Sequence, residues 1–266
     1  MTTRDDDLAR IEEALGLAAE ALRPFTSGDI DHVVKDRGDP LTEADLAVNR
    51  VLLGALPGPG EGWLSEETRD DPGRLDRRRV WVVDPIDGTR EFVDGIPEWC
   101  VSIGLVEDGE PVAGGIHNPA TGETMVGAVG HGVRLNGSAV EPTDRAGLEG
   151  AVVLASRTEV NRGEWERFAE APFRVIPCGS VAYKLACVAA GLADATWTLV
   201  PKHEWDVAGG AALLRGAGGV VVHADGTVPR FNRRDPLLPD FLAGHPELLE
   251  AFRREWVVPE RRDGLP

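Results

Sequence analysis

Long apolar runs, paired cysteines and positive charge are all scarce in this sequence. No apolar run approaches the roughly 18–20 residues of a membrane span, and the N-terminal MTTRDDDLAR is too acidic for a signal peptide. The three cysteines, Cys100, Cys178 and Cys187, lack zinc-like spacing, so we expect reduced, buried thiols and a cytoplasmic location. The formal net charge of −17 argues against nucleic-acid polymers and anionic membranes as partners.

Several catalytic signatures are missing as well. There is no Gly-x-Ser-x-Gly elbow and no persuasive Cys/His pair, so a serine or cysteine hydrolase lacks support. No Gly-x-x-x-x-Gly-Lys loop indicates an NTPase, and there are no repeats. The composition, 42% hydrophobic and 27% charged over 266 residues, is instead that of a globular protein with one large domain or two lobes.

Two helices followed by an antiparallel sheet are predicted for the N-terminal half. Apolar residues recur at helical spacing in residues 5–25 and 42–56. From Val80 the pattern alternates, as in strands, and three dipeptides are typical of hairpin turns: Asp108-Gly109, Thr121-Gly122 and Asn136-Gly137. We assign this half to residues 1–145.

Strands and helices alternate in the second half, which we assign to residues 146–266 as an α/β lobe. We expect strands at 151–156, 173–178, 195–200 and 219–226. We expect helices at 161–170, 180–191, 204–219 and 240–252. Ser180 and Gly191 are typical of the start and end of a helix. The fold class is therefore mixed, α+β with α/β.

Acidic residues lie at four places where predicted elements begin or end. In WVVDPIDGT, residues 81–89, Asp84 and Asp87 directly follow an apolar strand, where unneutralised carboxylates would cost several kcal/mol. Single acids mark the other three places: Asp45 in TEAD, Glu66 in LSEE and Asp206 in EWDVAGG. Each has a structural explanation, since Asp45 and Asp206 could cap helices, Glu66 could be a surface residue, and DPIDG could be a tight turn.

Taken together, the acids indicate a metal site. Two or three divalent cations sharing Glu66, Asp84, Asp87 and Asp206 would neutralise them. A helix starting at Thr89 would also turn the amides of Gly88 and Thr89 towards a phosphate.

Five segments occur in a recognisable order: K-x-x-x-D-P-L-T-E-A-D (35–45), L-S-E-E (64–67), W-V-V-D-P-I-D-G-T (81–89), G-S-V-A-Y-K-L (179–185) and W-D-V-A-G (205–209). In these segments the chain resembles, almost from end to end, the lithium-sensitive, Mg²⁺-dependent inositol monophosphatase superfamily. This resemblance implies a layered α-β-α-β-α sandwich, a homodimer, and a phosphomonoesterase whose metal ligands lie mostly in the N-terminal half.

The resemblance also implies metal ligands. One Mg²⁺ would be held by Glu66, Asp84 and the main-chain carbonyl of Ile86. A second would be held by Asp84, Asp87 and Asp206, and a third, weaker ion would lie near Glu66. Two ions about 3.5–4 Å apart can stabilise both the attacking and the leaving oxygen of an in-line displacement.

Catalytic and substrate-binding roles follow from the same resemblance. A metal-activated water would be the nucleophile, oriented and deprotonated by Thr89 and Asp45, with Glu66 also in the catalytic set. The amides of Gly88 and Thr89 would hold the phosphate. Other residues expected to contact substrate are Asp87, Arg157, Gly179, Ser180, Lys184, Lys202 and Asp206.

Three features resemble the 3′(2′),5′-bisphosphate nucleotidase branch: LSEE, Arg90-Glu91-Phe92 after DGT, and Ser156-Arg157. Arg157, Lys184 and Lys202 could bind a second phosphate. Inositol phosphatases carry a Glu about seven residues before the Trp-Asp pair, where this chain has Leu199 and Val200.

We therefore expect removal of the 3′-phosphate of adenosine 3′,5′-bisphosphate. Inositol monophosphate, fructose 1,6-bisphosphate and histidinol phosphate are the alternative substrates. A catalytically silent scaffold should have lost at least one of the implied site acids or Thr89, and all are present.

Overall fold

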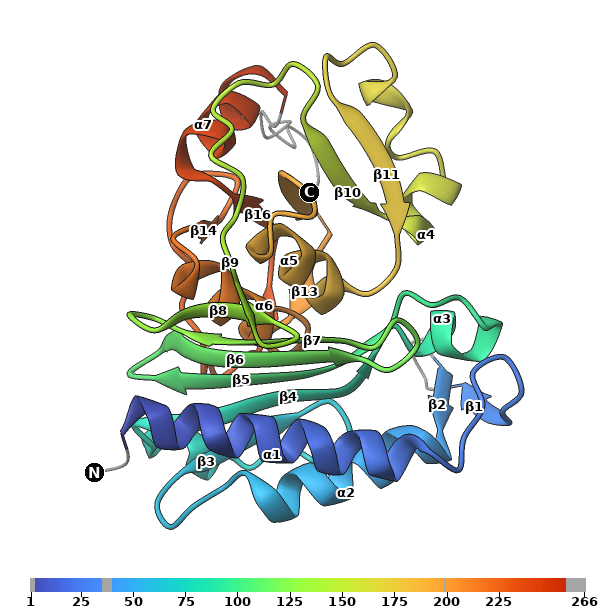
Figure 1. The fold of residues 1–266 in the computed structure, drawn as a ribbon, viewed down its shortest axis with the longest axis vertical. Coiled ribbons are helices and arrows are strands. Elements are labelled where there is room, and N and C mark those ends of the chain that lie inside the picture. The colour runs from blue at the N-terminus through green and yellow to red at the C-terminus, as the bar shows by residue number, and fades with distance from the viewer. Residues whose placement is uncertain (1–2, 35–39, 199, 257–266) are drawn as a thin grey trace, which may run out of the picture.

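Five layers of helix and sheet alternate in the computed structural model, which describes residues 3–34, 40–198 and 200–256 (Figure 1). Helices α1 (Arg4–Leu22) and α2 (Glu43–Ala55) cover one face of a seven-stranded sheet. Helices α5 (Val181–Ala189) and α6 (Glu204–Gly216) lie between this sheet and a five-stranded one. The outermost layer contains α7 (Pro246–Glu255). The predicted α-β-α-β-α sandwich is confirmed.

The seven-stranded sheet contains consecutive strands in chain order, β3 to β9. Their bounds are β3 (Gly62–Ser65), β4 (Arg79–Asp87), β5 (Cys100–Glu107), β6 (Glu110–Asn118), β7 (Glu123–Ala128), β8 (Gly132–Leu135) and β9 (Ser138–Val140). All neighbours are antiparallel except β3 and β4, which are parallel. Asp108 and Asn136 have φ values of +51° and +47°, as turn residues of hairpins do, so the predicted turns are confirmed.

The five-stranded sheet has the order β11-β10-β12-β16-β14 and mixes parallel with antiparallel pairs. Its strands are β10 (Val152–Ser156), β11 (Arg174–Cys178), β12 (Ala195–Thr198), β14 (Val220–Val222) and β16 (Phe241–Gly244). Short elements complete the described chain: β1 (His32–Val34), β2 (Pro40–Thr42), η1 (Pro72–Asp76), α3 (Thr89–Asp94), α4 (Arg157–Asn161), η2 (Glu166–Phe168), β13 (Lys202–His203) and β15 (Leu237–Leu238).

The predicted helix at 161–170 is wrong. The chain forms only the short α4 and, after a turn, the single 3₁₀ turn η2. Gly163 has a φ of +78°, which a helix does not tolerate, and this turn brings aromatic rings inward. The rings of Trp165 and Phe168 lie 4.9 and 5.6 Å from that of Trp197, so tertiary packing overrides the helical pattern.

The predicted helix at 240–252 is wrong in its first half. Phe241–Gly244 forms β16, which is hydrogen-bonded between β12 and β14, and a helix begins only at Pro246. Proline is favoured in the first turn of a helix and disfavoured inside a central strand, so it separates the two elements. Sequence spacing alone did not distinguish the apolar strand from a buried helix.

The helix that follows Ser180 is confirmed, and it lies close to α6. The Ser180 hydroxyl accepts a hydrogen bond from the Tyr183 amide at 3.0 Å and so caps α5. A Cβ at Gly210 of α6 would lie 2.3 Å from the Cβ of Leu185, so glycine is required there for the two helices to approach. This close packing fixes where the first turn of α6 lies.

One hydrophobic cluster joins the two sheets. It includes Val82 of the first sheet, Leu185 of α5, Leu213 of α6 and Ala243 of the second sheet, all buried. Because both sheets share this cluster, it does not separate the two predicted lobes. The division into lobes 1–145 and 146–266 stays a prediction. Within the described residues, no helix has both the length and the apolar character needed to cross a membrane.

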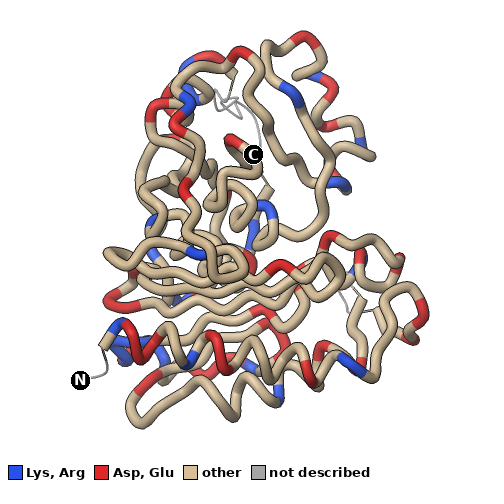
Figure 2. Tube along the Cα trace, in the orientation of Figure 1, with Lys and Arg blue, Asp and Glu red and all other residues tan. Residues whose placement is uncertain are grey.

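Lys, Arg, Asp and Glu residues gather near the N-terminal end of α1 (Figure 2). Ion pairs there join α1 to β4 and to Glu61, the residue before β3. The Glu61 carboxylate accepts hydrogen bonds from Arg10 at 2.6 Å, from Arg79 at 2.8 Å and from the Trp81 indole at 2.8 Å. Burial alone would raise the pKa of Glu61, but hydrogen bonds from Trp81, Gly58, Arg79 and Arg10 outweigh it and lower the pKa to about 2. Glu61 is therefore ionised in the folded protein at all ordinary pH values.

Glu61→Gln should destabilise the protein by on the order of 3 kcal/mol near neutral pH, because it leaves two partly buried guanidinium groups without this carboxylate. Since the folded pKa is depressed, the stabilisation is present above about 4.5 and is lost as pH falls towards about 2. Urea denaturation midpoints at pH 7 and pH 3 test this, because the difference from wild type should shrink at pH 3. Glu164→Gln, which removes an exposed ion pair with Arg162, is the control.

Candidate active site

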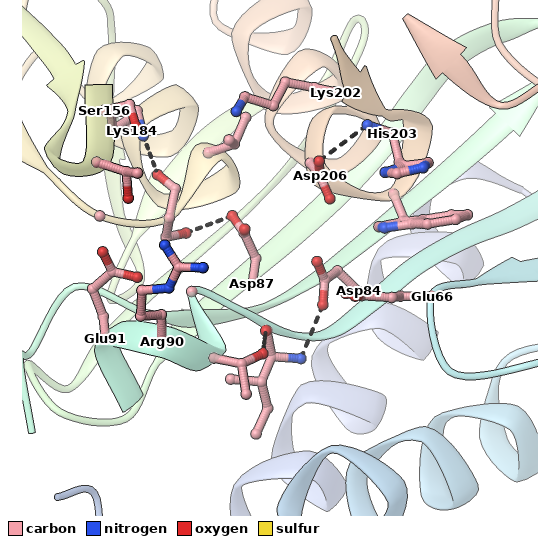
Figure 3. A pocket seen from close by; sticks show the side chains of 18 of the residues that line it. Glu66, Asp84, Asp87, Arg90, Glu91, Ser156, Lys184, Lys202, His203 and Asp206 are labelled. Atoms are coloured by element: carbon pink, nitrogen blue, oxygen red, sulfur yellow. Dashed lines mark hydrogen bonds between the residues drawn. The ribbon is translucent and has the colours of Figure 1, made fainter. Parts of the chain in front are cut away.

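A cavity of about 650 Å³ opens where the end of β4 meets the first turns of α3, α5 and α6. Its lining includes the predicted acids Glu66, Asp84, Asp87 and Asp206. Figure 3 shows these carboxylates on one side and Lys184 and Lys202 on the other. The structure thus brings together side chains from four separate stretches of the sequence.

A bulge at the end of β4 aims two acids into this cavity. Side chains three positions apart on a regular strand point to opposite faces of the sheet. Asp84 pairs with Ser102 and Asp87 pairs with Cys100, and the register between strands β4 and β5 shifts between these pairs. The shift turns Asp84 and Asp87 to the same side.

Asp206 reaches the same place from the first turn of α6. One oxygen from each of Asp84, Asp87 and Asp206, here named the carboxylate cluster, lies within 4.8 Å of the others. Asp206 also accepts a hydrogen bond from the His203 amide at 3.1 Å, which completes a capping box. Asp206 therefore both caps α6 and belongs to the carboxylate cluster.

Burial and mutual repulsion make the carboxylate cluster unfavourable by itself. Burial raises the pKa of Asp84 well above its ordinary value, and the charges of Glu66 and Asp87 raise it further. Asp206 behaves in the same way, with burial first and Asp87 next. Hard oxygen donors that repel one another in this manner fit Mg²⁺ or a similar divalent cation.

Asp87 is held more firmly than the other two acids. Burial raises its pKa, but hydrogen bonds from Ser180 and Ala182 oppose that shift. The Ser180 hydroxyl lies 2.6 Å and the Ala182 amide 2.5 Å from the same oxygen, Oδ2. The other oxygen of Asp87 is therefore the one available to a cation.

Thr89 lies between two oxygen acceptors. Its hydroxyl is 2.9 Å from the Ile86 carbonyl oxygen and 3.2 Å from Oδ1 of Asp45. Asp45 also accepts hydrogen bonds from the amide and the hydroxyl of Thr42, so it caps α2 as well. Ile86 lines the cavity, and the role of its carbonyl as a metal ligand stays a prediction.

Gly88 is the turn between β4 and α3. Its φ is +91°, and a Cβ there would lie 3.0 Å from the Glu98 carbonyl oxygen, so the position requires glycine. Thr89 then starts α3, with its amide in the first turn. The phosphate-holding role of the Gly88 and Thr89 amides stays a prediction.

The three basic side chains predicted to contact the substrate lie in different places. Lys184 lines the cavity although it is buried, and its ammonium donates to the Ser180 carbonyl at 2.8 Å. Burial lowers its pKa. Lys202 also lines the cavity, with its ammonium 4.0 Å from a Glu159 oxygen. Arg157 is not among the described lining residues, and its guanidinium pairs with Glu98 at 2.6 Å.

Several lining residues were not assigned a site role from the sequence, among them Arg90, His203 and Trp205. The His203 and Trp205 rings stack, with centroids 4.4 Å apart and 4° between the planes. The sequence could have indicated them, because Arg90 follows Thr89 and because His203 and Trp205 lie close to Asp206 in the chain. Lys35, Asp39 and Leu199, which entered the motif argument, lie outside the described residues.

A sequence model of the inositol monophosphatase family matches residues 5–257. The chain belongs to the inositol monophosphatase family. It is therefore a phosphatase of a metal-dependent family, and the carboxylate cluster agrees with that dependence.

Curated family members align over most of the chain. The fructose-1,6-bisphosphatase/inositol-1-monophosphatase of Thermotoga maritima is 34% identical over 206 residues, covering 75% of this chain and 78% of that protein. Inositol monophosphatase 1 of Solanum lycopersicum is 32% identical over 265 residues, covering 91% and 94%.

Solved structures of family members are also similar. The extragenic suppressor protein SuhB of Bartonella henselae superposes with a TM-score of 0.78 at 28% identity, covering 93% of this chain and 96% of that one. CysQ of Bacteroides thetaiotaomicron, a bacterial member of the family, superposes with a TM-score of 0.75 at 26% identity, covering 90% and 96%.

Proposed function

We propose that this phosphatase removes the 3′-phosphate of adenosine 3′,5′-bisphosphate by Mg²⁺-dependent attack of water. The observation that supports this substrate is the pair of lysines in the cavity, Lys184 and Lys202, across from the carboxylate cluster. One phosphate beside the carboxylates and a second beside the lysines would use both charged walls.

Each part of the proposed reaction is assigned to particular residues of this chain. Mg²⁺ held by Glu66, Asp84, Asp87 and Asp206 would supply positive charge to the phosphoryl group and lower the pKa of water. Thr89 orients the attacking water through its hydroxyl. Asp45, hydrogen-bonded to that hydroxyl, receives the proton by way of Thr89. The first turn of α3 presents main-chain amides to the phosphate oxygens.

Inositol monophosphate is the second candidate substrate. The names of several curated relatives, including those from Thermotoga maritima and Solanum lycopersicum, favour it. Fructose 1,6-bisphosphate follows from the first of those names, and histidinol phosphate is a further alternative. CysQ of Bacteroides thetaiotaomicron, a bacterial member of the family, is about as similar in structure to this chain as SuhB of Bartonella henselae is.

The deciding experiment compares kcat/KM for the four esters under identical Mg²⁺ concentrations. We expect adenosine 3′,5′-bisphosphate to exceed the others by about tenfold or more, as one extra charge-assisted contact would provide. A higher kcat/KM for inositol 1-phosphate would reject the nucleotide proposal and leave the phosphatase assignment intact.

Lys202→Met should lower the ratio of kcat/KM for adenosine 3′,5′-bisphosphate to that for p-nitrophenyl phosphate by about tenfold. The reason is that the ammonium would contact only a substrate with a second phosphate. Steady-state kinetics with both esters measures the ratio. Arg23→Met, which removes an exposed cation at the end of α1, is the control and should leave the ratio as it is. An unaltered ratio in Lys202→Met would remove this lysine from substrate recognition.

Two further properties belong to this proposal through family resemblance. We expect Li⁺ to inhibit Mg²⁺-dependent turnover, which a titration with LiCl measures. We also expect a homodimer, which light scattering coupled to size-exclusion chromatography measures.

A further inference from the structure

Glu98 connects two parts of the chain that are distant in sequence. It lies between α3 and β5, and both of its carboxylate oxygens are 2.6 Å from Nη2 of Arg157, at the start of α4. One of these oxygens also accepts a hydrogen bond from the Gly179 amide at 2.6 Å. Glu98 therefore holds Arg157 and Gly179 at once.

Gly179 begins a short corner, residues 179–182, that leads from β11 into α5. Ser180 in this corner has a φ of +53°, which is uncommon for a residue other than glycine, asparagine or aspartate. Such a conformation persists only where the surrounding contacts enforce it. The hydrogen bond from the Gly179 amide to Glu98 is one of those contacts.

The same corner holds a member of the carboxylate cluster. The Ser180 hydroxyl and the Ala182 amide donate to one oxygen of Asp87, at 2.6 and 2.5 Å. Both bonds end on the same oxygen, Oδ2, so they fix the orientation of this member of the carboxylate cluster. A chain of contacts thus runs from Arg157 through Glu98 and the corner to Asp87.

A second contact connects the same segment to the acid-bearing turn. The Glu98 carbonyl oxygen lies against Gly88, where a Cβ would be only 3.0 Å away. Gly88 directly follows Asp87. The segment that carries Glu98 therefore makes two contacts around Asp87. Its backbone touches the turn that follows Asp87, and the Glu98 side chain binds the corner, residues 179–182, that orients Asp87.

We propose that Glu98, paired with Arg157, is a positioning residue that orients Asp87 for metal binding. The inference rests on the metal-dependent phosphatase assignment and not on the identity of the ester. It gives Arg157 a different task from the one expected from sequence, because the guanidinium is engaged by Glu98 and lies away from the described cavity lining.

The test measures Mn²⁺ binding to the metal-free protein without substrate, by electron paramagnetic resonance of free Mn²⁺. Glu98→Ala and Arg157→Ala should each weaken Mn²⁺ binding by about 10- to 100-fold, the usual effect of removing a partner that orients a metal ligand. The double variant should be no weaker than Glu98→Ala alone, because both residues act through one contact. Glu98→Gln, which can still accept from the Gly179 amide, should lose less.

Kinetics provide the second readout. Each variant should lower kcat/KM for every ester by the same factor, since Asp87 serves all of them. Arg162→Ala is the matched control, because it removes an exposed arginine next to α4 whose ion partner is Glu164. It should leave Mn²⁺ binding within about twofold of wild type.

Two results would overturn the inference. One is unchanged Mn²⁺ affinity in folded Glu98→Ala and Arg157→Ala, with or without loss of activity. The other is an Arg157→Ala protein that loses activity only towards the bisphosphate, which would make Arg157 a substrate ligand. If Glu98→Ala fails to give a wild-type circular dichroism spectrum, Glu98→Gln and Arg157→Lys carry the test, and unchanged affinity in both rejects the proposal. A wrong ester assignment leaves the Mn²⁺ measurements unaffected.

Discussion

Asp84→Asn should lower kcat by about a thousandfold or more while raising the thermal stability of the metal-free protein. Asp84 is 2% exposed and lies in the centre of the acids, with Glu66 and Asp87 as its strongest like-charge neighbours. An amide in its place relieves that repulsion but removes a shared oxygen ligand, so the protein gains stability and loses the metal site. The Ile86 amide can still donate to the retained side-chain oxygen.

Calorimetry in EDTA and steady-state kinetics in Mg²⁺ together measure this effect. The melting temperature in EDTA should rise by roughly 2–4 °C for each kcal/mol of repulsion relieved. Wild type should gain stability when Mg²⁺ is added, and Asp84→Asn should gain little. Asp144→Asn, which alters an exposed carboxylate, is the control. A variant that keeps near-normal kcat at saturating Mg²⁺ would show that the cluster is not the metal site.

Thr89→Ala should lower kcat by about 10²–10⁴-fold with little change in metal affinity. Its hydroxyl is the group that connects the attacking water to Asp45, and general-base assistance is worth about this factor. The substitution leaves the carboxylate cluster in place. Thr89→Ser keeps the hydroxyl and should retain most of the activity.

Combining kcat with Mn²⁺ affinity separates this role from a structural one. Loss of kcat with unchanged Mn²⁺ binding is the expected result for a residue that handles a proton. If Thr89→Ala instead loses Mn²⁺ binding, the hydroxyl serves to place the Ile86 carbonyl, whose oxygen lies 2.9 Å from it and is its alternative acceptor.

The acids of the site could be predicted from sequence because each follows or begins an element. Asp84 and Asp87 lie at the end of the apolar strand β4, and Asp206 is in the first turn of a helix. What spacing did not reveal is the bulge that turns the first two to one side. Bulges depend on pairing with the neighbouring strand, and that pairing is set by long-range contacts.

Side chains with ambiguous partners were the hardest to predict. Arg157 had the residue type for binding a phosphate, but its bidentate bond to Glu98 depends on a turn 59 positions away in sequence. Lys184 was expected near substrate, and its burial on α5 could not be read from its neighbours. Likewise, Phe241–Gly244 is a central strand that pairs with β12 on one side and β14 on the other, and its own sequence does not reveal these long-range contacts.

The bulge at the end of β4 also limits how this protein can vary. If this segment paired regularly with β5 at its present length, the local ladder would be stronger, yet Asp84 and Asp87, three positions apart, would point to opposite faces of the sheet. A change that improves the sheet would thus eliminate the chemistry. The irregular pairing of this four-residue segment therefore serves the site and not the sheet that carries it.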